Sequence, residues 1–253
     1  MVLVLPGALL VGLSLGLLGS GGSILTVPIL VYLVGQDEKV AIASSLAIVA
    51  LISMAGAAQF IQEKLVQWRT VLMFGVPGIV GTYAGAALSA YAPGALQMLT
   101  FAVVMLAASW FMLKPSSPAP CTQETNIYKV GAEGFVVGIV TGFVGVGGGF
   151  LIVPALVLLG GLTMQQAIAT SLVIITLKSI AGFAKYLEVI QASNLGIDWG
   201  VIGFFTVAGI FGSLIGSHFA CRVPQEKLKT GFGPFLVVVA LFVLSQSIPQ
   251  LMA

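Results

Sequence analysis

Long apolar stretches separated by short polar loops follow one another along almost the whole chain, and this pattern constrains the fold more than any other feature. Only 7% of the 253 residues are charged, whereas a soluble domain carries about 25%. So few charges could not cover the surface of a protein in water, so the sequence predicts an all-α polytopic protein of the lipid bilayer. The apolar stretches are 3–34, 40–61, 70–91, 95–113, 129–159, 165–187, 196–220 and 231–248.

Several classes of function are excluded by what the chain lacks. The formal net charge is +2 and the basic residues are scattered, which excludes a nucleic-acid partner. Cys121 and Cys221 are 100 positions apart without histidines nearby, so no metal site or disulfide framework is predicted. His218 and Glu133 are isolated, and no catalytic triad, carboxylate pair or nucleotide motif is present. We therefore expect neither an enzyme nor a cofactor.

Two of the apolar stretches are too long for one ordinary span, and both contain a glycine cluster followed by a proline. GLLGSGGSILTVPIL occupies 16–30 and GFVGVGGGFLIVPAL occupies 142–156. The other six stretches have the length of one spanning helix, about 17 to 25 residues. Several neighbouring glycines break a helix more than close packing requires. We therefore expect each long stretch to be a broken or hairpin segment.

The two halves of the chain are internal repeats. At an offset of 126, segments 16–31 and 142–157 share 9 of 16 residues, and AIASSL at 41–46 aligns with AIATSL at 167–172. After an insertion of five, GIVGTYAG at 78–85 aligns with GIFGSLIG at 209–216. The predicted organisation is one transmembrane repeat over 1–113, a linker over 114–127 and a second repeat over 128–253.

The distribution of lysine and arginine indicates how these repeats are oriented. If each long stretch crossed the membrane once, the loop charges would divide five against four. If each long stretch is a hairpin, they divide seven against two, a clear positive-inside bias. The second arrangement predicts inverted repeats of one hairpin and three spanning helices each, with the linker in the cytoplasm and both termini outside.

Hairpin arms of about 12 to 16 residues rise only about 18 to 24 Å, less than the roughly 30 Å of the hydrocarbon core. The hairpin tips would meet near the middle of the membrane, where irregular backbone must be buried in protein or line a cavity. Glycine N–H groups at the start of a half-helix attract anions. The predicted anion-binding residues of the tips are Gly19, Ser20, Gly21, Gly22, Ser23, Gly145, Gly147, Gly148 and Gly149.

Polar residues inside the spans supply further candidates. Lys178 lies near the middle of its span and aligns with Ile52 of the first repeat. We interpret this lysine as a substrate or gating contact; the alternative is a structural ion pair. Hydroxyl groups could also bind an oxyanion or else bond back to their own helix. These hydroxyl candidates are Ser44, Ser45, Thr170 and Ser171, with Gln59 as a weaker candidate. Glycines 81, 85, 212 and 216 are expected to serve helix packing.

The duplicated GxxGxGGGxLxVPxL element, the AIATSL segment and the Gly196-Ile-Asp-Trp199 element resemble the sulfite exporter TauE/SafE family over essentially the whole chain. The first copy departs from the pattern at Ser20 and Ser23. The resemblance implies a multi-pass protein of the bacterial inner membrane that transports small sulfur-containing anions such as sulfite, thiosulfate or organosulfonates. An anion channel and a transporter of small carboxylates stay open as alternatives, as do coupling to protons or Na⁺ and the oligomeric state.

Overall fold

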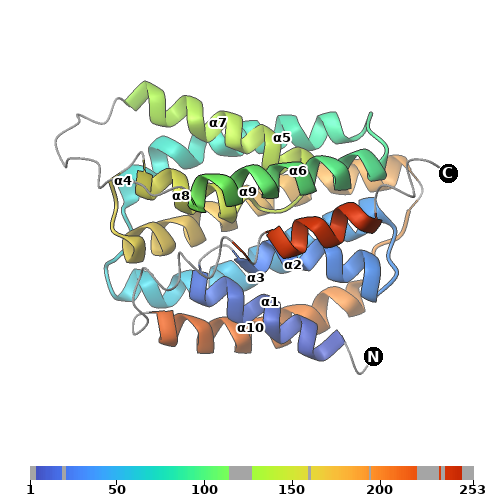
Figure 1. The fold of residues 1–253 in the computed structure, drawn as a ribbon, viewed down its shortest axis with the longest axis horizontal. Coiled ribbons are helices and arrows are strands. Elements are labelled where there is room, and N and C mark those ends of the chain that lie inside the picture. Colours follow the sequence, from blue (N-terminus) through green and yellow to red (C-terminus); the bar gives the residue numbers. More distant parts are fainter. Residues whose placement is uncertain are drawn as a thin grey trace.

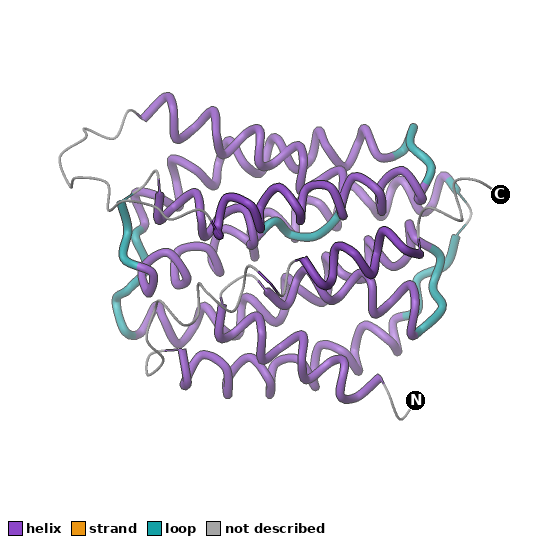
Figure 2. Tube along the Cα trace, in the orientation of Figure 1, coloured by secondary structure: helices purple, strands orange, loops and turns teal. Residues whose placement is uncertain are grey.

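The computed structural model describes residues 4–18, 21–113, 127–158, 161–193, 195–220, 234 and 237–246. Within these ranges the regular structure is helical throughout (Figure 2), which confirms the predicted all-α class. Gly19, Ser20, the linker residues 114–126 and the predicted loop at 221–230 lie outside the described residues.

Two long helices cross the centre of the bundle. These are α3 (Glu38–Gln62) and α9 (Met164–Ala192), which pack against each other. At 1.5 Å per residue they rise about 37 and 43 Å, enough to cross a bilayer. α9 begins with a capping box, in which Thr163 and Gln166 exchange hydrogen bonds between side chain and backbone. Both helices bury most of their length, as helices at the centre of a membrane bundle do.

The helical segment that follows the central helix of each half also has spanning length. In the first half, α4 (Trp68–Thr70), a π-helical turn (Val71–Gly75) and α5 (Val76–Ser89) form one continuous helical segment. In the second half the corresponding helix is α10 (Trp199–Ala220), whose first turn is capped by the Asp198 carboxylate. With α3 and α9, these make four helices of the described chain that are long and apolar enough to cross a membrane.

The expected breaks are present in both glycine-rich stretches. α1 (Val4–Leu18) is followed by α2 (Gly21–Pro28) and a π-helical turn (Ile29–Leu33), and α7 (Ile127–Val144) is followed by α8 (Gly149–Leu158). α2 and its π-helical turn together rise about 20 Å and α8 about 15 Å, short of the hydrocarbon thickness. The remaining apolar helices of the described chain are α6 (Gly94–Leu113) and Val237–Gln246.

Helices of one half pack against helices of the other half. α1 of the first half packs along α10 of the second, and α7 of the second half packs along α5 of the first; these two pairs form opposite edges of the bundle in Figure 1. α1 begins at the end of the bundle where the N-terminus is marked, whereas α7 begins at the opposite end. The two sequence halves therefore do not form separate bundles.

Glycines bring the backbones of these exchanged pairs into direct contact. A Cβ atom at Gly212 of α10 would lie 2.5 Å from the Leu9 carbonyl oxygen of α1, and one at Gly216 would clash with the Leu13 carbonyl. The same contacts recur in the other pair, where Gly81 and Gly85 of α5 approach the carbonyl oxygens of residues 135 and 139 of α7. The expectation that these four glycines serve helix packing is confirmed.

The outer surface carries many large apolar side chains, as expected of helices that face lipid. Val80 and Leu72 of the α4–α5 segment and Phe211 of α10 are each about 60% exposed. Trp68 and Trp199, which begin the third helix of each half, are 55% and 62% exposed. Their positions at helix starts fit indole side chains that anchor a span at the membrane interface.

The glycine contacts can be tested by adding one methyl group. We expect Gly212→Ala to lower the free energy of unfolding by about 1 to 3 kcal/mol, because the methyl group overpacks the α1–α10 contact. Gly203→Ala on the same helix is the control, since a Cβ there meets nothing within 4 Å. Thermal unfolding in detergent would check both variants, and equal melting temperatures would contradict the packing role of Gly212.

Candidate functional site

The best-defined part of the predicted site is the tip between α7 and α8, residues 145–148. Gly145, Gly147 and Gly148 have φ angles of 74°, 60° and 79°, a left-handed conformation that residues with a side chain rarely adopt. The Gly145 N–H donates to the Thr141 carbonyl oxygen of α7, and the Gly148 N–H donates to the Val146 carbonyl oxygen within the tip. In the first turn of α8, the N–H groups of Leu151 and Ile152 donate to the Gly148 carbonyl oxygen. A ligand would therefore meet the N–H groups that precede them, at Gly149 and at residue 150.

Helix α3 of the other half holds this tip in place. The Ser45 hydroxyl donates to the Gly145 carbonyl oxygen at 2.8 Å and also to the Ile42 carbonyl of its own helix at 2.8 Å. Ile42 and Val49 line the same face, and a Cβ at Gly147 would lie 3.2 Å from Val49 Cγ1. Ser45 thus makes the bond to its own helix that the sequence left as an alternative, and also a bond to the glycine tip that the sequence did not predict.

Lys178 lies beside the same tip, 14 residues from each end of α9, and is completely buried. Its Nζ donates to Thr141 Oγ1 of α7 at 3.1 Å. A Cβ atom at Gly148 would lie 2.9 Å from Thr141 Oγ1. Thr141 therefore contacts both the tip and Lys178. The ion pair found in the described part of the chain joins Lys185 and Glu188, so no described carboxylate pairs with Lys178.

In the described part of the chain, one buried hydroxyl group without a hydrogen-bond partner lies beside the tip, and similar groups occur in the first repeat. Ser179, the neighbour of Lys178, is completely buried, and its Oγ would lie 2.8 Å from a Cβ at Gly147. Ser53, which corresponds to Ser179 in the first repeat, and the predicted residue Ser44 are likewise buried and unpartnered among the described residues. A buried hydroxyl without a partner is costly, so Ser179, which faces the tip, is a candidate for a ligand contact.

The first tip connects α1 to α2, and the structure describes it only from Gly21 onward. Gly22 is buried, and a Cβ there would clash with the Val11 carbonyl and lie 2.5 Å from Leu15 Cβ, so α2 folds back on α1. Ser23 is completely buried. Gly21 and Gly149 are the first residues of α2 and α8, whereas Gly19 and Ser20 lie outside the described residues.

The remaining predicted residues make contacts away from the second tip. The Thr170 hydroxyl accepts from the Gln67 N–H at 3.1 Å, which places it beside the loop before α4. Ser171 donates to the Ile168 carbonyl at 2.8 Å, the bond to its own helix that the sequence left as an alternative. Gln59 Oε1 accepts from the Ser217 hydroxyl of α10 at 2.7 Å.

Sequence reasoning missed Thr141 and Ser179, and it missed two residues that support the second tip. Gln97 of α6 and Tyr186 of α9 both donate to the Phe143 carbonyl, at 2.9 and 3.0 Å, and Gln97 Nε2 also donates to the Tyr186 hydroxyl at 3.0 Å. Phe143 lies two residues before Gly145, so this cluster fixes the end of α7. A polar residue inside an apolar span was the available signal.

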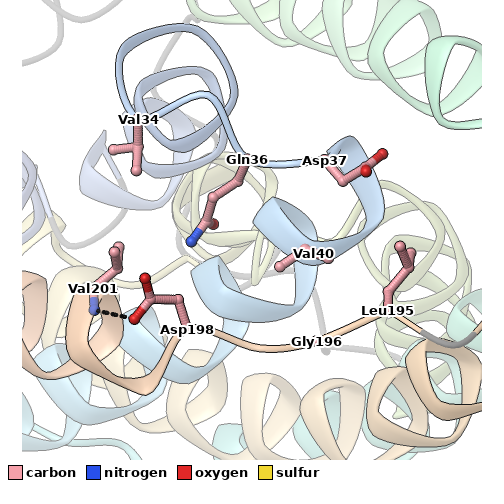
Figure 3. A pocket seen from close by; sticks show the side chains of 8 residues that line it. All are labelled: Val34, Gln36, Asp37, Val40, Leu195, Gly196, Asp198 and Val201. Atoms are coloured by element: carbon pink, nitrogen blue, oxygen red, sulfur yellow. Dashed lines mark hydrogen bonds between the residues drawn. The ribbon is translucent and has the colours of Figure 1, made fainter.

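A pocket of about 300 Å³ opens elsewhere, at the loops before α3 and α10 (Figure 3). Its polar lining consists of Gln36, Asp37 and Asp198, and Figure 3 shows the Gln36 amide directed toward the Asp198 side of the pocket. None of the predicted site residues lines it. Because two carboxylates repel anions, this pocket is not the predicted anion site.

Two broken helical stretches, a buried unpaired lysine and a lipid-facing exterior define a helical membrane protein with irregular backbone inside it. The chain belongs to the sulfite exporter TauE/SafE family, whose model matches residues 4–243. It is accordingly a multi-pass membrane transporter rather than an enzyme, as the resemblance of its glycine motifs implied.

Similar proteins carry the same general description. A probable membrane transporter protein of Xylella fastidiosa strain 9a5c is 32% identical, over 96% of this chain and 95% of its own length. Another, from Methanocaldococcus jannaschii, is 25% identical over 96% of both chains, and the probable membrane transporter protein YdhB of Bacillus subtilis is 23% identical over 90% of this chain and 94% of its own. No solved structure matches the chain significantly.

Alanine substitutions can separate two costs at the second tip: the backbone strain of a left-handed residue and the steric contact with Thr141. We expect Gly148→Ala to destabilise the protein by more than the roughly 1 to 2 kcal/mol that a left-handed residue with a Cβ costs, because the methyl group would also clash with Thr141. Gly161→Ala is the matched control, since Gly161 has a φ of 62° and open space around it. Thermal unfolding of both variants provides the measurement; a smaller loss at Gly148 would contradict the close contact with Thr141.

Proposed function

We propose that this protein is a secondary transporter of small sulfur-containing anions, such as sulfite, thiosulfate or organosulfonates, in the bacterial inner membrane. The observation that carries the proposal is the fully buried Lys178 ammonium, which contacts a neutral hydroxyl beside a glycine-rich tip. A buried charge without a counter-charge is costly, and inside a membrane such a residue marks a substrate path by default. An anion that binds beside Lys178 would provide the missing charge.

The backbone around Lys178 suits the same kind of ligand. The first turn of α8 contributes N–H groups and the positive end of its helix dipole. The Ser179 hydroxyl is directed at the tip and has no partner among the described groups. A cation, a hydroxyl and a helix N-terminus together provide hydrogen bonds for the oxygens of a small oxyanion. The glycine tips of both repeats would enclose this site from opposite sides.

We further propose that residues 1–113 and 128–253 are inverted repeats. The glycine contacts between α1 and α10 recur at the corresponding positions of α7 and α5, which is the pattern expected when a two-fold rotation relates the halves. The opposite starting ends of α1 and α7 support an axis in the membrane plane (Figure 1). Alternating access would then occur as one set of helices rocks against the other around the central α3–α9 pair.

Replacement of the buried lysine tests the function. We expect Lys178→Met to reduce the uptake of radiolabelled sulfite into proteoliposomes at least tenfold, because loss of a charged hydrogen bond costs about 1.5 to 3 kcal/mol. Lys185→Met is the control on the same helix, where the partly exposed lysine pairs with Glu188, and it should keep uptake within about twofold of the wild type. Undiminished uptake by Lys178→Met would refute the assignment. Saturation and counterflow exclude a channel, and a parallel assay with acetate tests for carboxylate transport.

The two native cysteines provide a test of topology. Cys121 lies between Lys114 and Lys129, and Cys221 is next to Arg222. Inverted repeats with hairpin segments place all these residues in the cytoplasm, because basic loops stay inside. A membrane-impermeant maleimide should therefore label neither cysteine in intact spheroplasts and both in inverted vesicles, with single-cysteine variants resolving the two sites. Labelling from opposite sides would contradict the inverted arrangement.

A further inference from the structure

We infer that the anion is held by the second half of the chain alone, although both halves enclose it. This inference rests on the proposed function and concerns the same site. It follows from a comparison of corresponding positions in the two halves, which make similar helix contacts but differ in polarity around the tips.

The first comparison concerns the central helices. Lys178 of α9 packs against Gly78, where a Cβ would lie 3.3 Å from Lys178 Cδ. The corresponding residue of α3 is Ile52, and it packs in the same way against Gly209, the residue that corresponds to Gly78; a Cβ there would lie 3.0 Å from Ile52 Cγ1. Corresponding positions of the two central helices thus carry a cation in one half and an aliphatic side chain in the other.

The second comparison concerns the hairpins. In the second half a Cβ at Gly148 would contact Thr141, whose hydroxyl accepts from Lys178. In the first half the corresponding glycine, Gly22, faces Leu15 instead. Leu15 is completely buried and apolar, so the polar pair of threonine and lysine has an apolar counterpart of leucine and isoleucine.

The support behind the tips differs in the same direction. Tyr186 and Gln97 hold the Phe143 carbonyl just before the second tip. The residue that corresponds to Tyr186 is Phe60, which is buried and has no hydroxyl to make this bond. Fixed donors bind an anion better than mobile ones because they lose less freedom on binding. The second tip is therefore the better prepared of the two.

These differences define the ligand and its orientation. The oxygens of a small oxyanion would receive hydrogen bonds from Lys178, Ser179 and the first turn of α8. The corresponding residues of the first half, Ile52 and Leu15, are buried and apolar and would suit the uncharged part of the same molecule. The site would thus take anions whose charge is concentrated at one end, organosulfonates included, and would bind them off the central axis.

One pair of serines supplies a matched test. Ser179 and Ser53 correspond in the two repeats, and both are completely buried with hydroxyls that have no partner among the described groups. In detergent, sulfite binding measured by calorimetry should weaken about tenfold in Ser179→Ala, since one hydrogen bond to a charged group is lost. Ser53→Ala should stay within about twofold of the wild type. Thr141→Val, which keeps the side-chain shape, should also weaken binding and serves if Ser179→Ala does not fold.

The outcomes separate this inference from the proposed function. Equal weakening by the two serine variants would place the anion on the axis between the halves and overturn the inference. So would a loss confined to Ser53→Ala, or unchanged affinity in both serine variants and in Thr141→Val. If the wild type binds neither sulfite nor thiosulfate, or binds them unchanged after Lys178→Met, the proposed function itself fails, whatever the serines do.

Discussion

Direct backbone contact between helices of opposite halves is the interaction on which this bundle depends. In lipid, apolar side chains gain little by leaving the solvent for one another, so helices associate through close packing and the dispersion contacts that it allows. Glycines of α10 meet the main chain of α1, and glycines of α5 meet that of α7. Each interface joins one half of the chain to the other, so neither half can complete its packing alone. The central α3–α9 pair is enclosed between these two edges.

This exchange also creates the interior in which a site can form. The arms α2 and α8 are too short to cross, so the backbone near their starts is buried within the protein. Buried backbone needs partners: Ser45 of α3 bonds the second tip itself, and Gln97 of α6 and Tyr186 of α9 bond the end of α7 just before it. Lys178 lies among the same elements, where lipid cannot reach its ammonium group. Structural support for an irregular tip and shelter for a buried charge thus come from the same helices.

Much of this arrangement could be predicted from the sequence. The helical membrane class follows from the scarcity of charge, and the separation of α1 from α2 and of α7 from α8 follows from glycine clusters that a helix does not favour. The packing role of the four glycines at 81, 85, 212 and 216 also follows from their spacing. The partner of Lys178 was not predicted, because Thr141 lies on another helix and its hydroxyl can bond to its own backbone, as many membrane threonines do. Ser179 was not predicted as a site residue either, because a serine inside a membrane helix commonly bonds to its own backbone. The alignment of the repeats pairs it with Ser53.

The sequence by itself determined that this protein lies in a lipid bilayer, where its glycine clusters interrupt the helices, and that its two halves are repeats. These features follow from composition, local conformational preference and the alignment of the two halves. Only the tertiary structure decided which half each helix packs against and which groups meet at the second tip. Ser45 and Gly145 are separated by 100 positions, and Lys178 meets Thr141 from a different helix. Such contacts depend on how whole helices cross, and helix crossing is set by the glycine interfaces between the halves rather than by any residue's immediate neighbours.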